Sequence, residues 1–181
     1  MRRARVALLA GLAALAFATA CSPEGPGPAP EITLPPPPTA PVGANGQPIA
    51  NLCELLDAKD FTDLAGLTAS APDTSKVTNT LATCEYGQHT RLTVTVAPSA
   101  DEAATAYAAA LQSRAFLSRE AGTIGGVDES VSGTGPETIG VAVRRRMLVF
   151  TIELPGATQE GKSKLIMLSG TLLSRAHALG T

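Results

Sequence analysis

Proline is concentrated in one segment of this chain, and that concentration decides which residues can build a folded core. Ten of the 14 prolines in the 181-residue sequence lie between Pro23 and Pro48, four of them in succession from residue 35. Proline donates no backbone hydrogen bond, and a segment rich in proline and glycine buries little apolar surface, so this segment is expected to stay extended. A single folded domain is therefore expected over residues 49–181, about 130 residues, which suffices for one core.

The N-terminus has the pattern of an export signal. Three arginines lie among the first five residues, residues 6–18 are apolar and uncharged, and small residues occupy positions 18–20. The apolar run is shorter than the roughly 20 residues that span a bilayer. Ala18-Thr19-Ala20-Cys21 resembles the lipobox of bacterial lipoproteins, whose cysteine receives a diacylglyceryl group before cleavage. Residues 1–20 are thus predicted to be a lipoprotein signal peptide and Cys21 the lipid attachment site; plain secretion, with Cys21 left as a thiol, is the alternative.

Lipid on Cys21 would place the protein on the outer face of the cytoplasmic membrane, in the cell envelope. Residues 21–48 would then be a disordered, lipid-anchored stalk, with a ligand for a proline-recognition module as the other reading. Without the signal peptide the chain keeps 11 basic and 16 acidic residues, a formal charge of −5. Because a net negative surface repels phosphate backbones, we expect no nucleic-acid partner.

Two cysteines remain for the folded domain. Cys53 and Cys84 form an even pair in an oxidising compartment, so a disulfide from the first helix to the first strand is predicted. No histidine or acidic cluster near them completes a metal site, so neither a metal nor another cofactor is expected.

The hydrophobic pattern predicts alternating helices and strands. Helices are expected at residues 51–67 (in two turns, the second capped by Asp57), 99–117 and 159–179; strands at 83–86, 91–97, 138–143 and 147–154; and loops at 68–80 and 122–135. The last helix is expected to bury Leu165, Ile166, Ser169, Leu172, Leu173 and Ala176. This order indicates an α+β fold, with an antiparallel sheet of about four or more strands packed against two to three helices and one disulfide.

Short motifs resemble those of DUF3558, a family of actinobacterial, mycobacterial-type lipoproteins of unknown function. The motifs are Cys21 before a proline-rich stalk, Cys53-Glu-Leu-Leu followed by Asp57, Cys84-Glu-Tyr, Gly125-Gly-Val-Asp-Glu and a closing Leu/Ala helix. The chain is similar also to the extracytoplasmic sensor domains of mycobacterial serine/threonine kinases. The resemblance implies an envelope location and a Cys53–Cys84 bridge but no reaction.

Few residues indicate chemistry. Residues 156–163 match the phosphate-binding pattern G-x-x-x-x-G-K-[ST], but an antiparallel sheet and an exported chain favour a chance match over nucleotide binding. The two histidines, His89 and His177, have no acidic neighbour that marks a catalytic set; His177 fits a cation at a helix C-terminus. Arg144-Arg145-Arg146 is expected at a hairpin tip, solvated or in contact with anionic headgroups. The loop at 122–135 is expected to be either a lip over a cavity or a long connection.

These observations favour a non-enzymatic module that binds a small hydrophobic ligand or a lipid, or acts as a sensor; the sequence does not indicate which residues bind it. An apolar groove between the last helix and the sheet would support this reading. The alternative is a protein–protein accessory subunit of an envelope complex, which would expose an apolar patch. A weaker third reading is a cell-wall or lipid hydrolase, which a histidine bonded to both a serine and a carboxylate would support.

Overall fold

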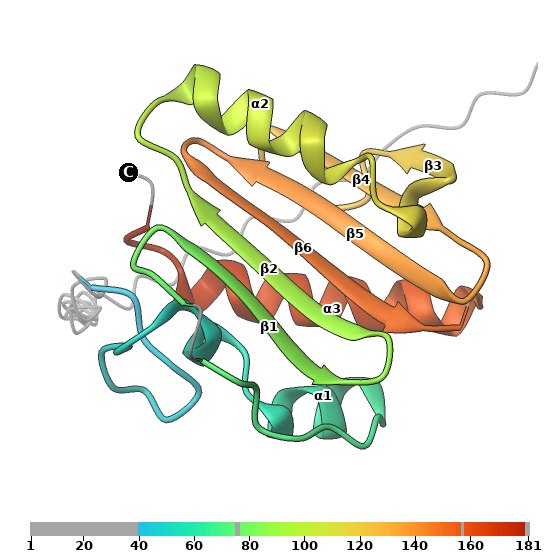
Figure 1. Cartoon of the computed structure of the whole chain (residues 1–181), viewed down its shortest axis with the longest axis horizontal. Helices are drawn as coiled ribbons and strands as arrows, with labels where there is room; N and C mark the ends of the chain where they lie inside the picture. The colour runs from blue at the N-terminus through green and yellow to red at the C-terminus, as the bar shows by residue number, and fades with distance from the viewer. Residues whose placement is uncertain (1–39, 75–76, 157, 180–181) are drawn as a thin grey trace, which may run out of the picture. The chain divides into compact units, whose positions relative to one another are not determined.

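The computed structural model describes residues 40–74, 77–156 and 158–179, and within them it contains one antiparallel sheet and helices on both of its faces (Figure 1). The strands are β1 (Leu81–Gly87), β2 (Thr90–Val96), β3 (Ser118–Ala121), β4 (Glu129–Thr134), β5 (Thr138–Arg145) and β6 (Leu148–Pro155). The α-helices are α1 (Ala58–Ala65), α2 (Ala100–Ala110) and α3 (Gln159–Arg175), with 3₁₀ turns η1 (Leu52–Leu55) and η2 (Arg114–Phe116). The predicted α+β fold with an antiparallel sheet and three helices is confirmed.

The strand order is β1-β2-β6-β5-β4-β3, and each neighbouring pair is antiparallel. Four of the five neighbouring pairs, β1–β2, β3–β4, β4–β5 and β5–β6, join strands that are consecutive in the sequence. The pairing of β2 with β6 is the long-range step, because more than fifty residues separate Val94 from its partner Phe150. β6 therefore lies at the centre of the sheet, between β2 and β5.

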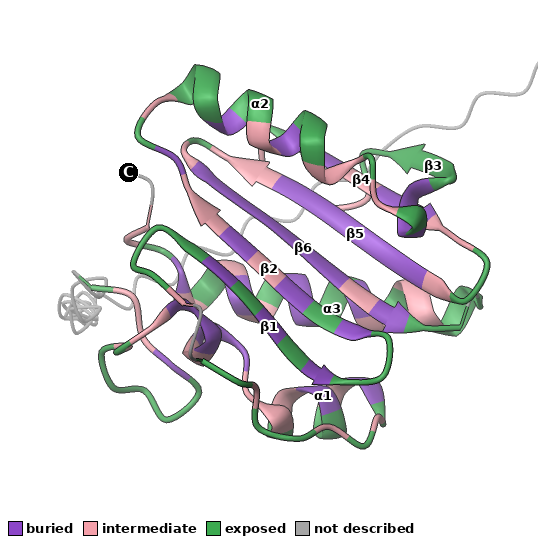
Figure 2. Cartoon of the chain, in the orientation of Figure 1, coloured by how far each residue is buried: buried purple, intermediate pink, exposed green. Residues whose placement is uncertain are grey.

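The core has two parts, one on each face of the sheet. α1 and α3 cover one face, where the larger cluster gathers the buried residues of β1, β2, β5 and β6. α2 and η2 lie on the other face, where Tyr107 and Phe116 pack with Ala142 and Val149. Central β5 is buried on both faces, whereas β1 alternates strictly between buried and exposed residues (Figure 2). Every second residue of β1 is thus exposed, on the face of the sheet that α1 and α3 do not cover.

The first helical segment folds as predicted. Asp57 accepts a hydrogen bond from the backbone N–H of Asp60, whose side chain accepts one from Asp57 in return, so a capping box starts α1 after the turn η1. Gly66, at φ 63°, ends the helix in the left-handed conformation that glycine adopts without strain. The predicted disulfide is confirmed: Cys53 in η1 is bonded to Cys84 in β1, with a Cα–Cα distance of 5.7 Å.

Helix α2 ends earlier than predicted, at Ala110 instead of residue 117. The Ser113 side chain accepts a hydrogen bond from the N–H of Ala115 and donates one to Glu153 in β6, at 2.7 Å. Serine competes in this way with the helical backbone, so the chain turns into η2 and buries Phe116. The predicted capping residue Ser99 does accept the Glu102 N–H.

Two strands were missed: β3 falls between the predicted helix 99–117 and the predicted loop 122–135, and β4 lies inside that loop. The one glycine of β4, Gly133, marks a close contact and not a loop. Gly133 pairs with Gly140 across β4 and β5, and the Phe116 ring packs over both. A Cβ atom on Gly133 would lie 2.5 Å from Phe116 Cδ1, closer than packed atoms approach, so only glycine fits.

Helix α3 follows the prediction except at its end and in one detail of its buried face. It ends at Arg175, four residues before the predicted end. Four of the expected residues are fully buried, whereas Ile166 is 45 % exposed and its place in the core is taken by Leu168. The buried stripe therefore lies close to the predicted one, and α3 also packs against α1.

Contacts of the domain begin before residue 49. Val42 and Pro48 form an isolated bridge, and the Val42 N–H donates to the carbonyl of Arg175 at the end of α3, at 3.1 Å. The predicted signal peptide, the lipid attachment site Cys21 and most of the predicted stalk lie outside the described residues.

Candidate functional site

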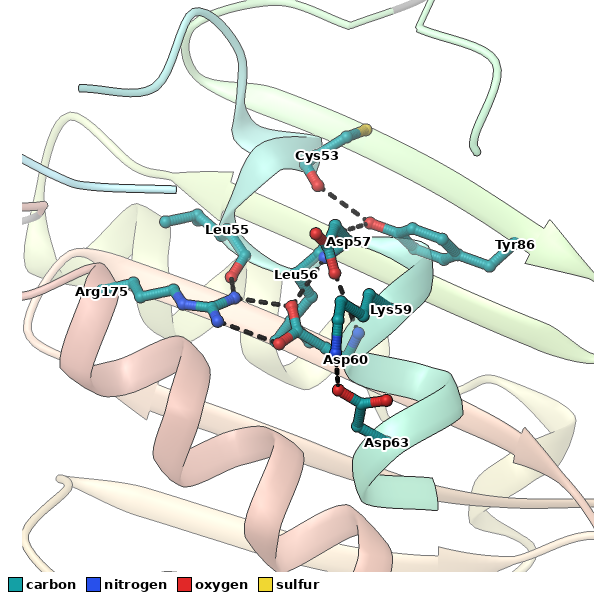
Figure 3. A network of polar contacts seen from close by, with 9 residues as sticks. All are labelled: Cys53, Leu55, Leu56, Asp57, Lys59, Asp60, Asp63, Tyr86 and Arg175. Carbon is teal, nitrogen blue, oxygen red and sulfur yellow. Dashed lines mark hydrogen bonds and ion pairs between the residues drawn. The ribbon is translucent and has the colours of Figure 1, made fainter. Parts of the chain in front are cut away.

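The most extensive polar network joins α1 to the end of α3 and closes on itself (Figure 3). The Arg175 guanidinium donates to both carboxylate oxygens of Asp60, at 2.6 and 2.9 Å, and to the carbonyl of Leu55 at 2.9 Å. Burial raises the pKa of Asp60, but the hydrogen bonds and charge of Arg175 and the N–H of Asp57 outweigh it, so the pKa lies below its ordinary value. The carboxylate and the guanidinium thus bind each other and hold α1 against the end of α3; we call this ion pair the clamp.

Tyr86 belongs to the same network. Its hydroxyl donates toward the carbonyls of Cys53 and Leu56, and its ring contacts Phe61 with centroids 4.4 Å apart. Burial, and then the nearby carboxylates of Asp57 and Asp60, raise the pKa of Tyr86. The tyrosine therefore ties the disulfide-bearing turn to the core and leaves no group free for a ligand.

A polar cleft of about 560 Å³ lies where the β1–β2 turn, η2 and the β4–β5 turn meet. His89 is here, at φ 61°, with its Nε2 3.6 Å from a carboxylate oxygen of Glu137. Ser113 lines the same cleft, but its hydroxyl donates to Glu153. Among the described residues no hydrogen bond joins a serine to a histidine. His177 lies exposed, two residues beyond the end of α3.

Two residues of the phosphate-loop match at 156–163 already have partners within the described residues. Lys162 Nζ lies 2.5 Å from Glu120 of β3, and the Gly161 N–H donates to Thr158 Oγ1, the cap of α3. Position 157 lies outside the described residues. The strand that precedes the match pairs antiparallel on both sides, in place of the parallel sheet of nucleotide-binding folds.

The arginine turn is mostly held by the protein itself. Arg144 pairs with Glu129 at 2.5 Å and with Asp128 at 3.6 Å, and Arg145 donates to the carbonyls of Leu173 and Ala176 at the end of α3. Arg146, at φ 56°, occupies the turn and has an exposed side chain. The predicted hairpin tip is therefore correct for Arg146, whereas Arg144 and Arg145 belong to β5 and brace the domain.

An apolar groove lies between α2 and the outer face of β1 and β2. It has a volume of about 710 Å³ and continues into a smaller hollow of about 240 Å³ over β2 and β6. Thr95, Ala106 and Ala109 line both spaces, so the two hollows are adjacent. At its open end, Leu81 is 51 % exposed. We call this combined space the apolar groove.

The apolar groove exists because small side chains face each other across it. α2 presents alanines at 106, 109 and 110, and β2 presents Thr93 and Thr95, so the helix and the sheet do not fill the space between them. Its volume lies in the range of sites that hold small molecules, roughly 300–1,000 Å³. The interface of α3 with the sheet, where a groove would have supported the binding reading, is filled by the fully buried Leu165, Leu168 and Leu172.

Sequence reasoning did not find the apolar groove. Its only sequence signal is the run of alanines in α2, which indicates a helix but not what lies opposite. Within the described residues, no cluster of three or more His, Cys, Asp or Glu side chains is placed to bind a metal ion. None of the helices described there has the length and hydrophobicity needed to traverse a bilayer.

Comparison with protein-family models, with curated proteins and with solved structures finds no match to this chain. The resemblance to the DUF3558 lipoproteins therefore stays a prediction from the motifs.

Proposed function

We propose that this chain is a cell-envelope lipoprotein of the DUF3558 type, attached through Cys21 to the outer face of the cytoplasmic membrane, whose domain is a non-enzymatic module that binds an apolar chain such as a lipid acyl group. The observation that carries the binding role is the apolar groove, with its volume of about 710 Å³ and the half-exposed Leu81 at its end. The anchor and location are supported by the residues that precede and include Cys21.

The shape of the groove favours a chain-like ligand over a globular one. It follows α2 from Glu102 past Ala106 to Ala110, and the opposite lining combines threonines with Val96, Val149 and Phe150. The polar residues of its lining are threonines and Glu102. An acyl chain would bury its methylenes along α2, each contributing about 0.8 kcal/mol, and keep a polar headgroup in water.

The alternative role, an accessory subunit that only contacts proteins, would call for one contiguous apolar patch. The large exposed apolar residues in the described part of the chain are Leu81, Leu117, Ile166 and Met167. They are divided among β1, the end of η2 and α3, so no more than two of them belong to one element. The apolar groove is the more continuous apolar surface, which favours ligand binding.

The groove is tested by filling it. Residues 37–181 form one compact unit, so a fragment of these residues keeps every contact described above. Ala109→Leu places a larger side chain in both parts of the groove, whereas Ala108→Leu makes the same change at an exposed neighbour on α2. A dansyl-labelled fatty acid is expected to bind the fragment and its Ala108→Leu variant equally, and the Ala109→Leu variant roughly tenfold more weakly.

Native mass spectrometry of the fragment secreted from an actinobacterial host provides a second readout. An added mass that is lost on denaturation, and is absent from Ala109→Leu, would identify the natural ligand class. Equal binding of the dye by both leucine variants would refute the groove as the site. The anchor is tested separately, because labelled palmitate should be incorporated into the full chain but not into its Cys21→Ala variant.

A further inference from the structure

A second hollow lies on the other side of α2, bounded by residues 121–131. Its volume is about 450 Å³, and its apolar walls come from Leu111 at the C-cap of α2, Ile124 and Val127 of the connection between β3 and β4, and Val131 of β4. It shares no lining residue with the apolar groove. The segment expected to be either a lip over a cavity or a mere connection is, in its first part, the wall of this hollow.

Tyr107 lines this hollow and has an unused hydrogen-bonding group. The residue is only 6 % exposed, and its hydroxyl is buried without a hydrogen-bond partner among the described residues. Its ring is fixed in the smaller core cluster with Phe116 and Val149. Buried hydroxyl groups nearly always have partners in native proteins, because the loss of hydration is otherwise uncompensated. Within the described residues, the Tyr107 hydroxyl is therefore a buried donor that no other group satisfies.

The other polar groups around the hollow are already engaged. Ser130 accepts a hydrogen bond from the Ile124 N–H and donates to the Ile124 carbonyl. Glu129 and Asp128 pair with Arg144, and Asp128 also accepts the backbone N–H of Arg146. These two carboxylates line the hollow, so it is unfavourable for an anion. Burial, and then the charge of Glu129, raise the pKa of Tyr107, so its hydroxyl stays protonated.

From this arrangement we propose that the hollow beside Tyr107 binds a small, uncharged and mostly apolar molecule that carries one hydrogen-bond acceptor, such as a ketone, with the Tyr107 hydroxyl as the donor. This site goes beyond the proposed function and is independent of the apolar groove. The four apolar wall residues hold the body of the molecule, and the two acidic side chains exclude a carboxylate of the same shape.

Three matched probes separate these contributions. Acetophenone carries a carbonyl acceptor, α-methylstyrene has the same shape without the acceptor, and benzoate carries a negative charge. Each is titrated into the fragment of residues 37–181, with ¹H–¹⁵N NMR spectra as the readout. Acetophenone is expected to give saturable shifts at the amides of Tyr107, Leu111, Ile124 and Val131, with an affinity about fivefold higher than that of α-methylstyrene. Benzoate is expected not to saturate.

Tyr107→Phe removes only the hydroxyl and provides the decisive comparison. In this variant acetophenone should lose about fivefold in affinity and match α-methylstyrene, whose own affinity should not change. The melting temperature of the unliganded variant should equal or exceed that of the parent, because an unpartnered buried hydroxyl is removed. The proposal is overturned by equal acetophenone affinity in both proteins, by shifts confined to other residues, by the absence of saturable binding, or by a lower melting temperature of the variant.

Discussion

The ion pair between Asp60 and Arg175 offers the sharpest test of what holds the two helices of the larger core together. The side chains are only 11 % and 18 % exposed, and the guanidinium makes two hydrogen bonds to the carboxylate and one to the Leu55 carbonyl. Arg175→Met keeps the apolar stem but leaves the carboxylate with the Asp57 N–H as its remaining hydrogen-bond donor. Removing one partner of a fully buried pair costs roughly 3–5 kcal/mol, and the residual exposure here reduces this to about 2–4 kcal/mol.

The pair can be isolated by a double-mutant cycle. Asp60→Asn, Arg175→Met and the double variant are unfolded in urea, followed by far-UV circular dichroism with the disulfide intact. We expect a coupling energy of about 2 kcal/mol between the two sites at neutral pH. Lys59→Met is the matched control, because it breaks the exposed Lys59–Asp63 pair on the same helix and should leave the urea midpoint unchanged within error.

The pH dependence of the cycle gives a second check. Since the pKa of Asp60 lies below its unfolded value, the carboxylate contributes stability above about pH 4 and loses it as the pH falls through the folded pKa. The stability difference between the parent and Arg175→Met should therefore shrink as the pH is lowered below about 4. A coupling energy under about 0.5 kcal/mol, or a difference that does not change with pH, would refute the clamp.

Three further substitutions are expected to change the stability of the domain. Replacing Cys53 and Cys84 by alanine should cost about 3–4 kcal/mol, because the bridge closes a loop across 31 residues; a urea midpoint within error of the parent would contradict this. Gly133→Ala should destabilise by about 2–3 kcal/mol by forcing Phe116 aside, while Gly170→Ala, which meets open space, should not, and calorimetric melting of both decides. Tyr86→Phe should remove a loss of stability at alkaline pH. The pKa of Tyr86 is raised in the folded protein, so its contribution to the free energy of unfolding is complete below about pH 10 and falls above it. The urea midpoints of the parent and the variant should therefore converge as the pH rises. Midpoints that stay parallel through that range would show that Tyr86 is not the titrating group.

Local patterns in the sequence were sufficient for the elements that local interactions determine. The period-two alternation of β2 and β6, the Asp57 cap and the pairing of Cys53 with Cys84 all predict what the structure contains. Each of these signals depends on residues a few positions apart, or on the parity of the cysteines, and needs no knowledge of the rest of the fold.

The errors occur where distant contacts decide. Gly133 reads as a loop residue until Phe116 is known to pack on it, and Ser113 reads as helical until Glu153 is known to lie beside it. The same limit applies to the candidate sites. Tyr107 is buried on α2, but no pattern in the sequence could indicate that its hydroxyl would lack a partner among the described residues.

The position of the disulfide has a mechanical consequence for a chain held by its N-terminal end. Tension applied there would first break the Val42 hydrogen bond to Arg175 and peel away the residues up to Cys53, an extension of about 40 Å. At Cys53 the force would pass through the covalent bridge into β1 at Cys84. Helix α1 lies inside the closed loop and would carry no tension, so the bridge limits how far a pulled chain can lengthen before the sheet itself has to yield.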